Sequence, residues 1–185
     1  MGTAGQRKSY DRLLAFGQKN LNDTFHLDGI QRVSARDHIL REIISNLLAH
    51  RDYSSGYIAK LVIEKDRIFT ENANLSHGYG ILNPVSFEPF QKNPPISKVF
   101  REIGLADELG SGMRNTYKYT NMYSGEDPIF EEGDVFRITI PLSEVATATV
   151  GPTYPTQDAT QVTTQDATQD IVEKLAALIN FCSEP

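Results

Sequence analysis

The sequence predicts an α+β fold, a two-layer sandwich in which helices cover one face of a mixed β-sheet. Residues 35–51 place apolar side chains at i, i+1, i+4, i+5, i+8 and i+9, which is the spacing of an amphipathic helix. Two further segments, 57–70 and 128–140, are rich in β-branched and aromatic residues around a turn, as β-hairpins are. A chain of 185 residues with 39% hydrophobic content also has enough apolar side chains for one domain with a core.

The first half of the chain is expected to alternate helices with extended segments. Asp28-Gly29 is a turn signal, and Ser34 suits the N-cap of the main helix because its hydroxyl can accept a hydrogen bond from a backbone N–H of the first turn. The expected elements are a helix before residue 22, an extended segment at 25–30, the helix at 35–51, and a hairpin of strands 57–64 and 67–70.

The second half begins with a long irregular segment, 71–95, whose Asn, Gly, Pro and Ser content predicts a functional loop or lid. Gly104 is expected to end a short helix, and Glu132-Gly133 to turn the last strand pair. The expected elements are helices at 96–103 and 113–123 and strands at 128–130 and 134–140.

Composition changes after Leu142, which predicts a module at 1–142. Residues 143–169 contain the hexapeptide TQDATQ twice and are expected to form a low-complexity linker. Residues 170–185 have an amphipathic helical pattern, and we expect them to be the first helix of a truncated further domain.

Charge and cysteine content narrow the classes of function. The formal net charge is -6, so this chain by itself is a poor candidate for non-specific binding to a phosphate backbone. Its single cysteine, Cys182, excludes an internal disulfide and suits a reducing compartment. With neither a signal peptide nor a long apolar run in the sequence, a cytoplasmic protein without a membrane partner is expected.

The clearest candidate site is the row Glu42, Asn46 and His50. A spacing of four advances only about 40° around a helix, so the three side chains lie along one flank, beside the apolar stripe. A carboxylate, an amide and an imidazole there could act as a base, a metal ligand and a phosphate or water contact. The alternative is an ordinary polar flank.

Three other segments carry candidate ligand-binding residues. Glycines before a helix let backbone N–H groups approach an anion, and a lysine can contact phosphate. In each case the alternative is an ordinary loop or a solvated lysine. The residues are Gly110, Ser111 and Gly112 before the helix at 113–123, Asn72, Asn74, Gly78 and Gly80 in the segment ENANLSHGYG, and Lys92 before the helix at 96–103.

Taken in order, these motifs resemble the Bergerat, or GHKL, nucleotide-binding fold of gyrase, MutL and histidine kinases. The segments REIISNLLAHRDYS, ENANLSHGYG, KNPPISKVFREIG and ADELGSGMRN are similar to a C-terminal module of bacterial proteins labelled RecG-related helicases or transcriptional regulators. Those proteins often have an AlbA-like, Schlafen-type domain before this module and a winged helix after it. The resemblance covers residues 10–142, and the sequence contains no Walker A motif of a helicase motor.

The resemblance implies ATP with Mg²⁺ as the cofactor. It implies that Glu42 is the general base for the attacking water, that Asn46 holds Mg²⁺ through the nucleotide, and that the glycines at 110–112 line the phosphates. His50, the candidates of ENANLSHGYG and Lys92 would make the remaining nucleotide contacts. The Asp of the family's Asp-x-Gly-x-Gly box is missing, since Glu71-Asn72-Ala73-Asn74 stands in its place.

These observations predict a sensor or signalling module of a transcriptional regulator, with DNA bound through domains missing from this chain. A second copy of the chain is a further candidate partner. The missing Asp keeps two alternatives open: a degenerate scaffold or dimerisation domain that binds no nucleotide, and a weak Mg-dependent ATPase.

Overall fold

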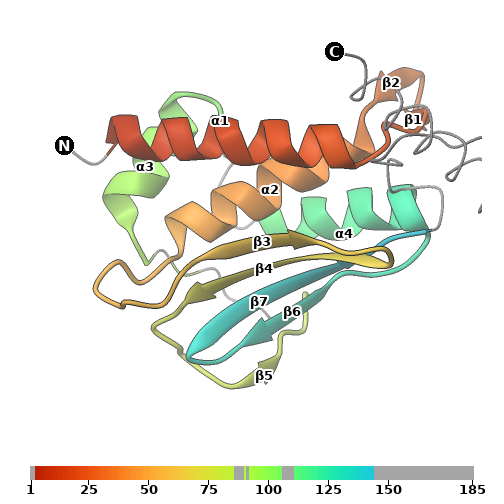
Figure 1. Ribbon diagram of the computed structural model, residues 1–185. Coiled ribbons are helices and arrows are strands. Elements are labelled where there is room, and N and C mark those ends of the chain that lie inside the picture. The colour runs from red at the N-terminus through yellow and green to blue at the C-terminus, as the bar shows by residue number, and fades with distance from the viewer. Residues whose placement is uncertain (1–2, 86–89, 91, 106–110, 144–185) are drawn as a thin grey trace, which may run out of the picture. The chain divides into compact units, whose positions relative to one another are not determined.

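The computed structural model describes residues 3–85, 90, 92–105 and 111–143. Helices and strands there follow one another in the order of an α+β fold (Figure 1). The elements are α1 (Thr3–Asn20), β1 (His26–Asp28), β2 (Gln31–Val33), α2 (Ala35–Ala49), β3 (Lys60–Ile63), β4 (Arg67–Ala73), β5 (Gly80–Ile81), α3 (Pro94–Glu102), α4 (Ser111–Ser124), β6 (Ile129–Glu132) and β7 (Val135–Pro141).

The main sheet has the strand order β3-β4-β7-β6-β5, and β1 and β2 form a separate hairpin. The helices lie on one side of the main sheet (Figure 1), which confirms the predicted α+β sandwich. A mixed sheet was predicted, yet every pairing among the described strands is antiparallel. The physical reason is that β3–β4 and β6–β7 are joined by tight turns, which allow only antiparallel pairing. The long connection between these two hairpins brings β7 beside β4, and this pair is also antiparallel.

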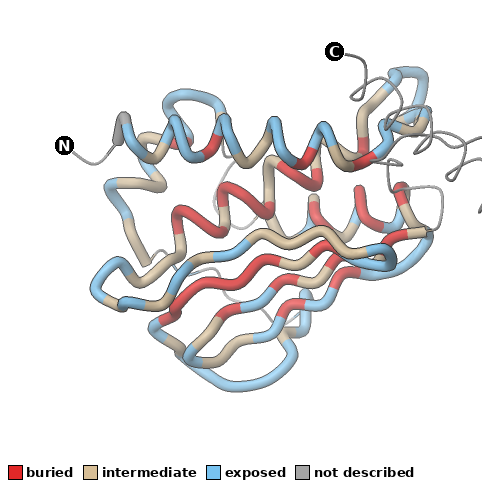
Figure 2. Tube along the Cα trace, viewed as in Figure 1, coloured by how far each residue is buried: buried red, intermediate tan, exposed pale blue. Residues whose placement is uncertain are grey.

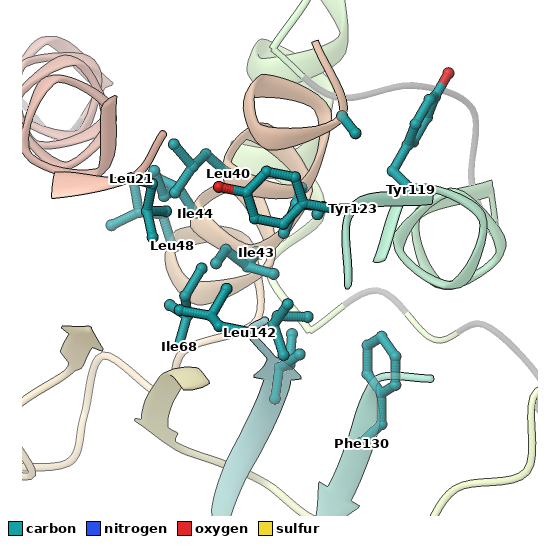
Figure 3. Packing of buried hydrophobic residues seen from close by; sticks show 14 of the residues in the cluster. Leu21, Leu40, Ile43, Ile44, Leu48, Ile68, Tyr119, Tyr123, Phe130 and Leu142 are labelled. Atoms are coloured by element: carbon teal, nitrogen blue, oxygen red, sulfur yellow. The ribbon is translucent and has the colours of Figure 1, made fainter. Parts of the chain in front are cut away.

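Helix α2 is the centre of the core. Ser34 Oγ accepts a hydrogen bond from the backbone N–H of Asp37 at 3.1 Å, so the predicted N-cap is confirmed. Buried positions run along α2 and strand β4 (Figure 2). Figure 3 shows how the apolar face of α2 packs: Leu40, Ile43, Ile44 and Leu48 lie among Leu21, Ile68 of β4 and Leu142, which follows β7.

Several boundaries differ from the sequence prediction. Strand β4 continues to Ala73, because its ladder with β7 extends to the pair Ala73–Val135. Glu71 and Asn72 are therefore strand residues rather than the start of a loop, since pairing overrides the low strand propensity of Asn. The segment predicted as irregular also contains β5, α3 begins at Pro94, and α4 begins at Ser111.

No helix within the described ranges is long and apolar enough to span a membrane. The predicted linker after Ser143 and the predicted terminal helix at 170–185 lie outside the described residues.

Candidate functional site

The row Glu42, Asn46 and His50 runs along α2 between three other elements. Helix α2 contacts α4, α3 and β4. The Glu42 end of the row faces the first turns of α4, and the His50 end lies where β4 ends and α3 begins. The structure thus brings residues from the other three predicted motif segments to this helix.

The carboxylate of Glu42 lies against the start of α4. Asn115 Nδ2 donates to Glu42 Oε1 at 3.1 Å, and a Cβ on Gly112 would lie 2.9 Å from Glu42 Oε2. A side chain at position 112 would therefore make this carboxylate shift from its present place. A negative charge is favourable beside the N-terminus of a helix. Two residues of the predicted site, Glu42 and Gly112, lie next to each other, and the contact is between the protein's own groups.

Asn46 has a side-chain oxygen that is buried. Among the described residues, no hydrogen-bond donor reaches Asn46 Oδ1. An unsatisfied buried acceptor costs about 1–3 kcal/mol, so it calls for an explanation such as a water, an ion or a ligand. This atom lies in the middle of the row, where the resemblance implies a magnesium–nucleotide contact.

His50 ends α2 and is held neutral. Its backbone N–H donates to Asn46 O at 2.9 Å, and its carbonyl accepts from Asn72 Nδ2 at 3.4 Å. Burial, helped by the positive charge of Lys92, lowers the pKa of His50 from 6.5 to about 4. At neutral pH the imidazole is therefore uncharged, and it can donate or accept a hydrogen bond but cannot neutralise a phosphate.

Lys92 forms a buried cluster with residues from the ends of two strands. Its Nζ donates to Asn74 Oδ1 and lies 3.5 Å from Glu132 Oε1, and the Lys92 and Glu132 side chains are each 10% exposed. Asn74 Nδ2 donates to Gly133 O at 2.8 Å, and the backbone N–H of His77 donates to Glu132 Oε1 at 3.1 Å. The cluster ties the segment after β4 to the end of β6 and the approach to α3.

The pKa values of both charged groups in this cluster, Lys92 and Glu132, are lowered. Burial lowers the pKa of Lys92, and the Glu132 carboxylate only partly opposes this effect. Burial by itself would raise the pKa of Glu132, but the His77 N–H and the Lys92 charge outweigh it and lower the pKa. The carboxylate is therefore ionised at neutral pH and forms an ion pair with Lys92.

Glu71 and Asn72, which begin the segment that stands in place of the missing Asp box, point to opposite faces of β4, because side chains alternate along a strand. Asn72 is buried on the helix side and reaches the carbonyl of His50. Glu71 instead accepts from Arg137 Nε at 2.9 Å and Lys60 Nζ at 3.0 Å. Burial would raise the pKa of Glu71, but these partners lower it to about 2. Only Asn72 is therefore placed near the row.

Two predicted glycines stand apart from the row, and one cannot be placed. Gly78 and Gly80 are exposed, and within the described residues a Cβ on either would meet no atom within 4 Å. Gly80 has φ of 116°, so the turn geometry explains this glycine without a ligand. Gly110 lies outside the described residues, whereas Ser111 forms the first residue of α4.

The donor set fits a magnesium ion held mainly by nucleotide. The described residues contain no group of three or more His, Cys, Asp or Glu side chains that could hold a metal. Mg²⁺ commonly keeps several waters and takes one or two protein oxygens together with phosphates. The free oxygen of Asn46 is a suitable ligand of this kind, and a nucleotide would supply the phosphates.

Sequence reasoning missed three residues that build the site. Glu132 pairs with Lys92, Asn115 holds Glu42, and Asn93 Nδ2 donates to the carbonyls of Ala49 and Arg51 at 2.9 and 2.7 Å. Asn93 satisfies carbonyls at the C-terminal end of α2, which otherwise lack helical partners. Asn93 and Asn115 could have been found from the sequence, because they lie within the motif segments KNPPISKVFREIG and ADELGSGMRN. No local pattern identifies Glu132.

No family model matches this sequence. No curated protein matches it either. Among solved structures, the fold is similar to that of the DIP2311 protein from Corynebacterium diphtheriae, with a TM-score of 0.56 at 20% sequence identity. The match covers 74% of this chain and 29% of that one, so this chain spans less than a third of that protein's length. At this identity the similarity concerns the fold.

Proposed function

We propose that this chain is a nucleotide-responsive sensor module of a cytoplasmic transcriptional regulator, with a GHKL-like site on α2. The observation that carries the proposal is the buried Oδ1 of Asn46 in the middle of the row, for which the described residues provide no hydrogen-bond donor. A magnesium ion on a bound nucleotide would satisfy this oxygen. Binding would be passed to DNA through domains that follow this module, which the resemblance describes as a winged helix.

The charges around the row favour a ligand that carries phosphate. Lys92 precedes Asn93, whose side chain donates to the carbonyls of Ala49 and Arg51, so Lys92 lies near the His50 end of the row. Gly112 opens the first turn of α4 at the other end. A helix N-terminus and a lysine are both suitable phosphate contacts. Without the family's Asp, selectivity for adenine over other bases is expected to be weak.

The proposal is tested by isothermal titration calorimetry with Mg-ATP and Mg-ADP. Wild-type protein is expected to bind, and Asn46→Ala is expected to weaken binding about tenfold or more, since a metal ligand is lost. Asn121→Ala is the matched control, because Asn121 is exposed on α4. Folded wild-type protein that gives no heat at millimolar nucleotide would disprove nucleotide sensing.

A specific observation favours a second candidate, a scaffold or dimerisation domain with a vestigial site. Glu42 already accepts from Asn115 and packs against Gly112, and Lys92 already pairs with Glu132. For this candidate, Asn46→Ala leaves both the oligomeric state and the DNA binding of the full-length regulator unchanged. A large change in either property counts against a scaffold.

The engagement of Glu42 also argues for binding without hydrolysis. A general base must reach the attacking water, whereas this carboxylate is held by Asn115 at the start of α4. We therefore expect no steady phosphate release above the background of the Glu42→Ala variant. Release that is present in wild type and lost in Glu42→Ala would instead establish a weak ATPase.

A further inference from the structure

Two positions along the row are suited to hold an anion, and each contains a carboxylate of the protein itself. Glu42 lies at the N-terminus of α4, and Glu132 pairs with Lys92. The neighbour of Lys92, Asn93, donates to the carbonyls of Ala49 and Arg51 on either side of His50, which places this pair near the His50 end of the row. An anionic ligand on the row would therefore compete with the protein's own side chains. The Lys92 position offers the sharper test, because Glu132 can be changed without touching α2.

Lys92 is the group at this end of the row that is equipped to hold an anion. Helix α3 begins with Pro94-Pro95, and proline has no N–H to donate. The next two N–H groups, of Ile96 and Ser97, already donate to Asn93 O at 3.1 and 3.0 Å. The start of α3 therefore cannot hold a phosphate in the way that a free helix N-terminus does.

The bond between Lys92 and Glu132 is long for a pair so well shielded from water. The two atoms are 3.5 Å apart, beyond the usual 2.7–2.9 Å or so for a charge-assisted hydrogen bond. Burying both charges costs desolvation energy that only good geometry recovers. The ion pair with Glu132 is therefore the weaker of the two contacts of Lys92 Nζ, which also donates to Asn74 Oδ1.

Glu132 also has other donors that can hold it in place if Lys92 leaves. Its Oε1 accepts from the His77 N–H at 3.1 Å and lies 3.5 Å from Asn74 Nδ2. Lys92 can therefore turn toward a ligand without leaving a buried carboxylate wholly unsatisfied.

We propose that Glu132 is a built-in competitor that holds Lys92 in the ligand-free site, and that a phosphate-bearing ligand binds by taking Lys92 from it. This inference rests on the proposed nucleotide binding and names its regulation. Because the ligand must outcompete a carboxylate, di- and triphosphates bind better than monophosphates, and uncharged nucleosides do not displace Glu132.

The test compares Glu132→Gln with Glu131→Gln by calorimetry with Mg-ADP and with inorganic pyrophosphate. Both variants raise the net charge by one, but Glu131 is exposed and pairs with Arg137 at 3.7 Å. Gln at 132 keeps an oxygen for the His77 N–H. We expect Glu132→Gln to bind about tenfold tighter than wild type, because a charge-assisted contact no longer has to be broken. Glu131→Gln is expected to change the affinity less than about twofold.

The outcomes separate this inference from the proposed function. Binding by wild type that is unchanged or weakened in Glu132→Gln overturns the competitor role and leaves nucleotide sensing intact. If Glu132→Gln binds nucleotide and wild type does not, the competitor role is supported, and the wild-type protein is not a sensor by itself. Absence of binding in both proteins overturns both proposals.

A measurement on the wild-type protein covers the case in which Glu132→Gln does not fold. Lysines are labelled by reductive ¹³C-methylation, and the Lys92 signal is assigned through its loss in Lys92→Arg. Saturating Mg-ADP is expected to shift the Lys92 signal and to leave that of Lys65, a lysine in the β3–β4 turn, in place. A Lys92 signal that stays fixed while nucleotide binds overturns the exchange.

Discussion

At the scale of single residues, the three polar side chains of the row on α2 differ in their hydrogen-bond partners and in their charge. Glu42 is held by Asn115, Asn46 has a buried oxygen without a partner in the described structure, and His50 is kept neutral by burial and by Lys92. Polar groups of these kinds beside a core are costly unless they are satisfied. The cost falls on Asn46 and His50, which is where a ligand would relieve it.

His50 makes a prediction about acid stability. Its pKa is about 4 in the folded protein and near 6.5 when unfolded, so below pH 6.5 the unfolded chain binds the extra proton. The contribution of a neutral His50 is full above pH 6.5 and is lost as the pH falls toward 4. By about pH 5 the loss is about 2 kcal/mol.

Urea unfolding at pH 7 and at pH 5 measures this effect. In His50→Gln, the difference in the free energy of unfolding between pH 7 and pH 5 is expected to be lost. In His77→Gln, at an exposed position, this difference is expected to remain. Equal pH dependence in wild type and His50→Gln would show that His50 titrates normally.

At the scale of elements, close packing of α1 on α2 fixes the face that α2 turns to the sheet. A Cβ on Gly17 would lie 2.5 and 2.8 Å from the two Cδ atoms of Leu40, which is fully buried. The glycine therefore lets α1 approach the apolar side of α2. The polar flank of α2 is then left to face α4, α3 and the end of β4.

Two glycines of the same helix give opposite predictions. Gly17→Ala is expected to destabilise the protein by about 1–3 kcal/mol, because the added methyl group overpacks a site where Leu40 cannot move. Gly5→Ala is expected to be neutral or to stabilise by up to about 1 kcal/mol, since nothing lies within 4 Å and alanine favours helix. Thermal unfolding of both variants decides the matter, and a stabilised Gly17→Ala would contradict the close approach of the helices.

At the scale of the whole molecule, residues from both ends of the described structure close one core. The hydrophobic cluster extends from Tyr10 in α1 to Leu142 after β7, and Tyr10 packs edge-on against Phe100 of α3 at 6.1 Å. The central strand β7 pairs with β4 over seven residues, from Val135 to Pro141. The core is therefore complete only when β7 has joined the sheet.

This closure predicts where the chain can be shortened. A variant that ends after Ser143 is expected to unfold within about 2 °C of the full chain, because the described core retains all its members. A variant that ends after Gly133 lacks β7 and is expected not to fold cooperatively. Circular dichroism melts of the two variants test this, and a large drop in the melting temperature after truncation at Ser143 would place part of the core in residues 144–185.

The sequence by itself determined the helices, most of the strands and the row on α2. These features depend on neighbours within one or two turns: the apolar period of α2, the Ser34 cap, and the positive φ of 70° at Gly104 that ends α3. Tertiary structure alone decided the pairing of β7 with β4 and the extension of β4 through Asn72. It also decided which charges meet, since Lys92 and Glu132 are 40 residues apart and Glu42 and Asn115 are 73 apart. Contacts at such separations depend on sheet register and helix packing, and no local pattern encodes them.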